Sequence, residues 1–300
     1  MPEAPQPESP EVKRLAEQLQ QLRSEYERAR KAEAEQAKRQ QEMQRTLKAA
    51  LEANRRQLHE IAKVHDAFLP RSFDILGGLE VAAHCRPCHD MGGDFYAAEE
   101  LPDGRIAICI ADVAGHGAQA AVAMATTRAL LRVAFHEIQD HQGPSDVLLR
   151  LAVLFRDLLT VEQFVTMWLG IYSPERGELR FASAAHPPAV LWPASGEPQF
   201  LEIEPALPLG IAGIEPRRGP ERSIDFDLGD RVFLYTDGWN ESPSSTGETL
   251  SGERFLDFLA NAYGQPVSMV PAVLFMEFER HAANSRISDD VTLLVFDRVI

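Results

Sequence analysis

The chain has 300 residues, 45% of them apolar, and a formal net charge of −15. This length allows one or two domains with a sizeable hydrophobic core. The negative charge argues against nucleic acid or an anionic membrane surface as a general partner, because both would repel the chain. The cysteine count is three, an odd number that favours a reducing compartment over a disulfide framework.

Neither a secretory signal nor a membrane span is expected. The chain starts Met-Pro-Glu-Ala-Pro-Gln, with no basic start and no apolar core of a signal peptide. No stretch approaches the roughly 18 consecutive apolar residues that a membrane-spanning helix needs. We therefore expect a cytoplasmic protein with no membrane partner.

The first two segments of the chain differ in composition. Residues 1–10 are proline-rich and polar, which predicts disorder. Residues 11–68 contain neither glycine nor proline, and their apolar positions recur at alternating spacings of three and four, as in a coiled coil. These positions are Val12, Leu15, Leu19, Leu22, Tyr26 and Ala29, then Met43, Leu47, Ala50, Ile61, Val64 and Phe68.

The pattern predicts a helix about 85 Å long, at 1.5 Å per residue. We expect it to pair as a homodimer, most simply in parallel, although the sequence leaves the orientation open. The alternative is a single solvated helix that lies against the globular part. In either case Pro70 should end the helix, because it disfavours helical geometry at the residue before it.

Residues 71–300 have the texture of strands separated by turns. We expect strands at 79–85, 105–113, 164–172, 178–183, 189–192, 199–203, 231–235 and 291–296, and helices at 118–139, 145–159, 252–262 and 268–283. Runs of strands interleaved with pairs of helices predict an α+β domain. Two antiparallel sheets would pack together, with helices covering the outer faces.

Acidic residues lie where apolar, strand-like runs begin or end. Asp94 follows two glycines, Asp112 ends the run 106–111, and Asp237 follows the run 232–235. Asp289 and Asp290 open the last predicted strand. If these carboxylates converge, their repulsion calls for cations, and oxygen ligands favour Mg²⁺ or Mn²⁺. The alternative is that each aspartate caps a separate turn.

The segment after Asp112 reads Val113-Ala114-Gly115-His116-Gly117. Its small side chains would let a backbone carbonyl join a coordination sphere, and would bring the N–H groups of the following helix near an anion.

The order of these motifs resembles the metal-dependent serine/threonine protein phosphatases (the PPM family). The resemblance covers about residues 62–298 and is greatest to the bacterial branch of the SpoIIE and sigma-B-regulating phosphatases. The matching motifs are Gly92-Gly93-Asp94-Phe95-Tyr96, Asp112-Val113-Ala114-Gly115-His116-Gly117, Ala184-Ala185-His186-Pro187-Pro188, Leu207-Pro208-Leu209-Gly210, Tyr235-Thr236-Asp237-Gly238 and Asp289-Asp290-Val291-Thr292.

The resemblance implies an α-β-β-α sandwich with two Mn²⁺ or Mg²⁺ ions. Asp112 would bridge both ions, and the carbonyl of Val113 would bind one of them. The other ligands would be Asp94, Asp237 and Asp289, with Asp290 as the alternative to Asp289. A metal-activated hydroxide would attack the phosphorus without a phosphoenzyme.

The sequence contains further candidate residues for this site. His116 is a candidate acid for protonating the leaving serine oxygen, or a structural residue at a helix start. His186 is expected to be a turn residue, and Arg86 and Arg128 are candidate phosphate contacts. Trp239 stands where the family usually has a smaller residue, and its larger side chain would reshape the substrate groove.

One motif matches a haem-attachment pattern that we do not expect to be functional in this chain. Cys85-Arg86-Pro87-Cys88-His89 matches the attachment pattern of c-type haem, but that chemistry needs export, for which no signal is seen. A zinc site built from His84, Cys85, Cys88 and His89 is the other alternative to ordinary strand residues.

The sequence therefore predicts a phosphatase acting on phosphoserine or phosphothreonine of a regulatory protein, such as an anti-sigma-factor antagonist. The coiled coil would be its regulatory input and could receive an upstream sensor protein. The alternatives are a catalytically silent scaffold that binds phosphoprotein, and a phosphatase for small metabolites. No phosphate-binding loop or base-stacking pocket is evident to favour the metabolite.

Overall fold

A computed structural model of the chain describes residues 10–66, 75–88, 91–115, 117–156, 163–244, 247–282, 287 and 289–300. The chain divides into two units, Met1–Leu58 and His59–Ile300. The predicted disorder of residues 1–10 falls almost wholly outside the described residues, and so does the predicted helix end at residues 67–70.

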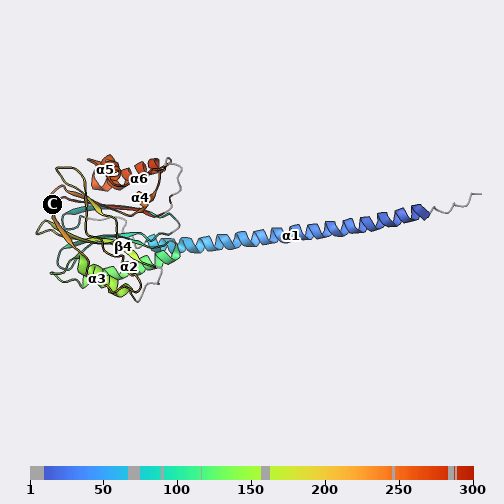
Figure 1. Cartoon of the computed structure of the whole chain (residues 1–300), viewed down its shortest axis with the longest axis horizontal. Helices are drawn as coiled ribbons and strands as arrows, with labels where there is room; N and C mark the ends of the chain where they lie inside the picture. Colours follow the sequence, from blue (N-terminus) through green and yellow to red (C-terminus); the bar gives the residue numbers. More distant parts are fainter. Residues whose placement is uncertain are drawn as a thin grey trace, which may run out of the picture. The chain divides into compact units, whose positions relative to one another are not determined.

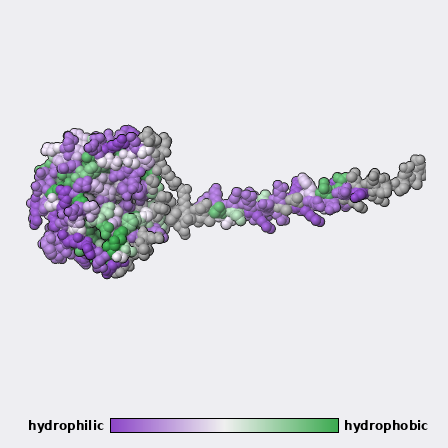
Figure 2. Space-filling model, in the orientation of Figure 1, coloured by the Kyte–Doolittle hydropathy of each residue, from purple (hydrophilic) through white to green (hydrophobic). Residues whose placement is uncertain are grey.

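Helix α1 runs without interruption from Pro10 to Asp66 (Figure 1). Large apolar side chains among its described residues are exposed to solvent, and green patches stand out along a mostly hydrophilic helix (Figure 2). The exposed large side chains include Leu19, Leu22, Tyr26, Met43 and Leu47. The homodimer that would cover them stays a prediction. Among the described helices, none is long and apolar enough to cross a membrane.

The second unit is built on two five-stranded antiparallel sheets. The first has the order β1-β10-β9-β6-β7, and its strands are Leu79–Arg86, Val291–Arg298, Arg231–Tyr235, Ala189–Trp192 and Gln199–Leu201. The second has the order β2-β3-β4-β5-β8, and its strands are Phe95–Glu100, Ile106–Val113, Val165–Ser173, Glu178–Ala184 and Arg222–Asp225.

The alternation along β3 explains the layers. Ile106, Ile108 and Ile110 pack between the two sheets, beside Trp168 and Phe296. The intervening residues 107, 109, 111 and 113 belong to the core on the opposite face. Because successive strand residues point to opposite faces, a strand that is apolar at every position must be covered on both sides.

Helices supply that cover (Figure 1). Helices α2 (Ala118–His136) and α3 (Pro144–Phe155) pack on the outer face of the second sheet. Helices α5 (Glu253–Leu259) and α6 (Val270–His281), with short helical turns at 260–262 and 267–269, pack on the first. The short helix α4 (Gly238–Glu241) lies beside them. The predicted α-β-β-α sandwich is confirmed.

Three elements were not predicted: strands β2 and β8, and helix α4. Strand β2 reads Phe-Tyr-Ala-Ala-Glu-Glu, and alanine and glutamate favour helices rather than strands. Both missed strands lie at the edges of the second sheet, where a single neighbouring strand fixes them by pairing.

Candidate metal centre

Asp94 lies immediately before β2 and is only 1% exposed. Its Oδ2 accepts hydrogen bonds from the hydroxyls of Thr236, at 2.8 Å, and Thr292, at 2.6 Å. Burying an ionised carboxylate is costly unless hydrogen bonds or charges compensate it. The two hydroxyls supply part of this compensation.

Asp112 and Val113 end β3 next to the Asp94 loop. A Cβ on Gly93 would lie less than 3.0 Å from the Val113 carbonyl oxygen and 3.3 Å from Asp112 Oδ1. Only a residue without a side chain fits at this approach. The glycine before Asp94 therefore brings its loop against both groups that the sequence analysis assigned as ligands.

The two aspartates before β10 have different environments. The carboxylate of Asp290 is buried and accepts two backbone N–H groups, Cys88 N to Oδ1 at 2.8 Å and Gly93 N to Oδ2 at 2.7 Å. Asp289 is only half-buried, and its Oδ1 accepts the N–H of Asp290 at 2.8 Å. Asp290 thus holds the Asp94 loop, whereas Asp289 is more open to solvent.

Asp237 follows β9 and starts α4, where its carbonyl accepts the N–H groups of Asn240 and Glu241 at 2.8 Å each. The next residue, Gly238, packs against the backbone of Asp290 so closely that a Cβ would come within 3.0 Å of the carbonyl oxygen. The loops that carry Asp237 and Asp289 therefore meet directly.

The carboxylates perturb one another. Burial, followed by the charges of Asp237, Asp289 and Asp290, raises the pKa of Asp112 to about 7. Burial, followed by the charges of Asp289 and Glu241, raises the pKa of Asp237 to about 6. Burial, followed by the charges of Asp112 and Asp290, raises the pKa of Asp94 well above its usual range. Together with the close approach of Gly93 to Val113 and of Gly238 to Asp290, these interactions bring the aspartate loops to one end of the sandwich.

The donor set fits a hard divalent cation. It consists of carboxylate oxygens and lies beside the carbonyl of Val113, and Mg²⁺ and Mn²⁺ prefer oxygen ligands. A cation would also offset the repulsion that raises the pKa values. The other predicted site residue, His116, lies outside the described residues.

Thr236 and Thr292 were not predicted to be functional residues. The available signal was a polar residue inside a buried run, since Thr292 stands between Val291 and Leu293 of β10. Cys88 was predicted only as a candidate zinc ligand and not as a neighbour of Asp289 and Asp290. Its Sγ and carboxylate oxygens of Asp289 and Asp290 lie within 4.8 Å of one another, although burial, followed by Asp290, raises the pKa of the thiol to about 12.

The four-residue zinc site is contradicted. His84 packs edge-on against Phe275 of α6, with ring centroids 4.3 Å apart, whereas Cys85 packs against the core between the sheets. Neighbouring residues of a strand point to opposite faces, so these two side chains diverge. His89 lies outside the described residues.

The proposed role of Trp239 in the substrate groove is also wrong. Its side chain is fully buried and packs against Phe258, Phe275 and Phe278, and its indole N–H donates to the Thr292 carbonyl at 2.8 Å. Trp239 therefore belongs to the core beneath the centre.

Each of the remaining candidates has a partner of its own. Arg86 pairs with Glu279 at 2.7 Å and Arg128 with Glu99 at 2.5 Å, whereas Nη1 of Arg128 is buried with no hydrogen-bond partner among the described residues. A phosphate contact by either arginine stays a prediction. His186 is buried and its Nδ1 hydrogen-bonds the hydroxyl of Thr166 at 2.8 Å. Burial lowers the pKa of His186 to about 3, so its ring stays neutral. We interpret His186 as a structural residue.

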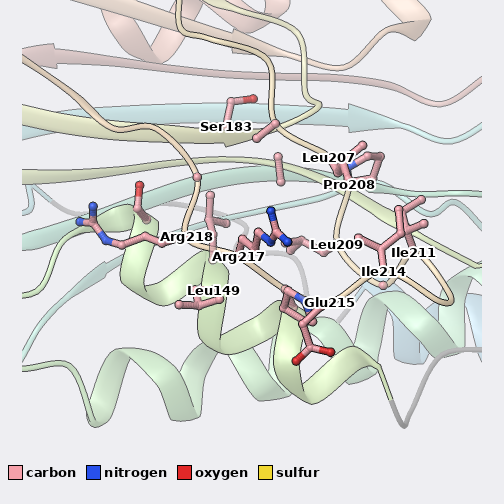
Figure 3. Close-up of a pocket in the computed structure, with 18 of the residues that line it drawn as sticks. Leu149, Ser183, Leu207, Pro208, Leu209, Ile211, Ile214, Glu215, Arg217 and Arg218 are labelled. Atoms are coloured by element: carbon pink, nitrogen blue, oxygen red, sulfur yellow. The ribbon is translucent and has the colours of Figure 1, made fainter.

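A separate pocket of about 410 Å³ lies between α3 and the loop that joins β7 to β8 (Figure 3). Its walls are mainly apolar and include Leu149, Leu207 and Ile214, and Arg217 lies among them. None of the aspartates of the metal centre lines this pocket. Backbone hydrogen bonds between Leu209 and Val165 attach the β7–β8 loop to β4.

Solved structures define the class. The PP2C domain of SiaA from Pseudomonas aeruginosa matches with a TM-score of 0.72 at 23% identity, over 83% of this chain and 98% of that one. The protein RsbX, crystallised with magnesium, matches with a TM-score of 0.53 at 14% identity, over 73% and 94%. The fold is that of the PP2C-type protein serine/threonine phosphatases.

The family follows from the sequence. The family model of stage II sporulation protein E (SpoIIE) matches residues 102–299, so the chain belongs to the SpoIIE family of metal-dependent phosphatases. This confirms the predicted resemblance.

Two curated relatives are longer than this chain. Phosphoserine phosphatase RsbU of Bacillus subtilis is 26% identical over 204 residues, which are 67% of this chain and 58% of RsbU. Protein IcfG of Synechocystis is 27% identical over 271 residues, 82% of this chain and 42% of IcfG. The chain thus spans about half the length of these relatives.

Proposed function

We propose that the chain hydrolyses phosphoserine or phosphothreonine on a partner protein, with two Mn²⁺ or Mg²⁺ ions at the aspartate centre. The observation that carries this proposal is the convergence of the aspartate loops, in which Asp237, Asp289 and Asp290 act on Asp112, and Asp112 and Asp290 act on Asp94. Such a cluster of negative charge needs cations. Membership of the SpoIIE family and the magnesium in the crystals of RsbX support the choice of metal.

Asp112 would be a ligand of these ions, because the carboxylates of Asp237, Asp289 and Asp290 all act on it. The Val113 carbonyl, Asp94 and Asp237 are proposed as further ligands. Of the last two aspartates, we assign Asp289 as the ligand, because both oxygens of Asp290 already accept backbone N–H groups. This supports the choice of Asp289 made from the sequence.

When bound, such ions lower the pKa of a water molecule and offset charge on the phosphoryl oxygens. The contribution of the chain is to hold the ligands in place. Asp290 fixes the loop of Gly93, and Gly238 allows the Asp237 loop to approach. His116 stays our candidate for protonating the leaving serine oxygen.

The substrate is proposed to be a phosphorylated regulatory protein, such as an anti-sigma-factor antagonist. RsbU, a relative by sequence, is named a phosphoserine phosphatase, which supports phosphoserine as the hydrolysed group. The PP2C fold shared with the domain of SiaA supports a protein as its carrier.

Regulation is proposed to act through α1. This helix of 57 residues leaves leucine side chains exposed to water, and pairing as a homodimer would cover them. An upstream sensor protein could then act on the helix pair. In domain terms, we propose a helical linker at 11–68 and a phosphatase domain at 71–300.

The test is turnover of a phosphoserine peptide and of para-nitrophenyl phosphate, with and without Mn²⁺, beside Asp112→Asn. We expect Mn²⁺-dependent release of phosphate that the variant loses. Bound Mn²⁺ with no turnover of either substrate, even after α1 is removed, would favour the alternative of a catalytically silent scaffold.

A further inference from the structure

Two threonine hydroxyls converge on one oxygen of Asp94. Thr236 and Thr292 are fully buried, and their Oγ1 atoms lie 2.8 and 2.6 Å from Asp94 Oδ2. The shorter distance is typical of a hydroxyl that donates to a carboxylate. A hydroxyl has one proton, so each threonine commits its only donor to this oxygen.

The surrounding backbone directs the proton of the Thr236 hydroxyl towards Asp94. The N–H of Thr292 donates to Thr236 Oγ1 at 3.0 Å, which uses the hydroxyl as an acceptor and leaves its proton for Asp94. The competing acceptor, the carbonyl of Asp290, lies at 3.5 Å, the limit for a hydrogen bond. The carbonyl of Thr292 in turn accepts the indole N–H of Trp239 at 2.8 Å.

These bonds join the two sheets. Thr292 lies in β10 and Thr236 follows β9, two neighbouring strands of the first sheet, whereas Asp94 leads into β2 of the second. The pairing of Leu293 with Tyr235 brings the two threonines opposite each other. The threonine pair therefore fixes Asp94 from the opposite sheet, at the end of the sandwich where the aspartates meet.

We propose that Thr236 and Thr292 are positioning residues of the metal centre, which hold Asp94 Oδ2 so that Oδ1 is the oxygen presented to a divalent cation. A carboxylate anchored by two donors cannot rotate freely, and groups that orient a metal ligand contribute to metal affinity. The proposal rests on the proposed metal centre and adds residues that act through Asp94.

A purely structural role would have a different signature. If the threonines only satisfied a buried carboxylate, their loss would change the stability of the chain and leave the affinity of the folded centre for cations unchanged. Metal affinity, measured apart from turnover, therefore separates the two roles.

The experiment compares Thr292→Val with Thr292→Ser, and Thr236→Val with Thr236→Ser, in the full chain. Valine keeps the shape and removes the hydroxyl, whereas serine keeps the hydroxyl. Mn²⁺ binding is followed by titration calorimetry, and folding by circular dichroism and metal-free melting. We expect each valine variant to bind Mn²⁺ about 10-fold more weakly, and each serine variant to bind close to the parent.

Thr127→Val is the matched control. Thr127 is also fully buried, but its hydroxyl donates to the Ala123 carbonyl at 2.8 Å within α2. This variant should lose stability like the others and keep the Mn²⁺ affinity of the parent.

Unchanged Mn²⁺ affinity in the folded valine variants would overturn the proposal, and so would equal losses for valine and serine. If Thr292→Val does not fold, Thr236→Val and the serine variants carry the comparison, because both hydroxyls contact the same oxygen. The titration needs no turnover. A parent chain that binds Mn²⁺ without hydrolysing phosphopeptide would therefore refute the proposed reaction and still test the threonine pair.

Discussion

The backbones of Gly238 and Asp290 touch where two loops of the centre meet. A Cβ on Gly238 would lie less than 3.0 Å from the carbonyl oxygen of Asp290. Each residue directly follows a proposed metal ligand, Asp237 in one loop and Asp289 in the other. This single contact therefore helps to set the distance between two ligands that come from different strands.

Gly238→Ala should push these loops apart. We expect a loss of about 1–3 kcal/mol in the free energy of unfolding, as for other overpacked sites, and a weaker response to Mn²⁺. Chemical denaturation and Mn²⁺ titration measure both effects. Gly219→Ala is the control, since the nearest atom to its Cβ would be Ala206 Cβ at 3.4 Å. Equal behaviour of the two variants would contradict the prediction.

Asp290→Asn should mainly lower the stability of the chain, whereas Asp289→Asn should mainly lower its affinity for Mn²⁺. In Asp290→Asn, the new amide group would face a backbone N–H, so we expect a loss of about 1–3 kcal/mol in the free energy of unfolding without metal. In Asp289→Asn, one repelling charge disappears beside Asp112 and Asp237, so the metal-free chain should be at least as stable as the parent. The affinity for Mn²⁺ should fall most in Asp289→Asn. The reverse pattern would move the ligand assignment to Asp290.

The stability of the metal-free chain should fall as pH rises. The folded-state pKa of Asp112, about 7, and that of Asp237, about 6, lie above the ordinary value of 3.8. The folded chain therefore binds more protons than the unfolded chain between about pH 4 and pH 7, and raising the pH in this range lowers the free energy of unfolding.

Mn²⁺ should reverse this trend, because its ligands must be deprotonated. Melting curves from pH 5 to pH 8, with and without Mn²⁺, test both parts, and Asp112→Asn should flatten the metal-free dependence. A metal-free melting temperature that rises with pH in the parent and not in Asp112→Asn would refute the assignment.

The exposed face of α1 should carry dimerisation. We expect Leu22→Glu combined with Leu47→Glu to convert a dimer into a monomer, because charges would replace leucines on the pairing face. Sedimentation velocity measures the mass, and phosphatase assays of the same samples show whether pairing regulates turnover. Replacement of the exposed Arg23 and Lys48 by glutamine should leave the mass unchanged. A parent chain that is a monomer at all concentrations would exclude the coiled coil.

The alternation of apolar residues was sufficient to predict most of the sandwich. Strands 189–192 and 231–235 were predicted with their observed bounds, because each is a short apolar run between turn residues. Edge strand β2 was missed because its sequence favours helix, and pairing with β3 determines its conformation. Backbone pairing with a distant segment is not visible in local sequence.

The sequence by itself determined which aspartates are candidates, because each stands at the boundary of an apolar run. Only the tertiary structure decided that Asp94, Asp112 and Asp237 lie near one another, and that Asp289 and Asp290 have different surroundings. It also placed Trp239 in the core and the hydroxyls of Thr236 and Thr292 on Asp94. The hydrogen bonds at this centre join residues up to 202 positions apart. Periodicity reports which face of an element is buried, whereas the packing of the two sheets decides which side chains meet there.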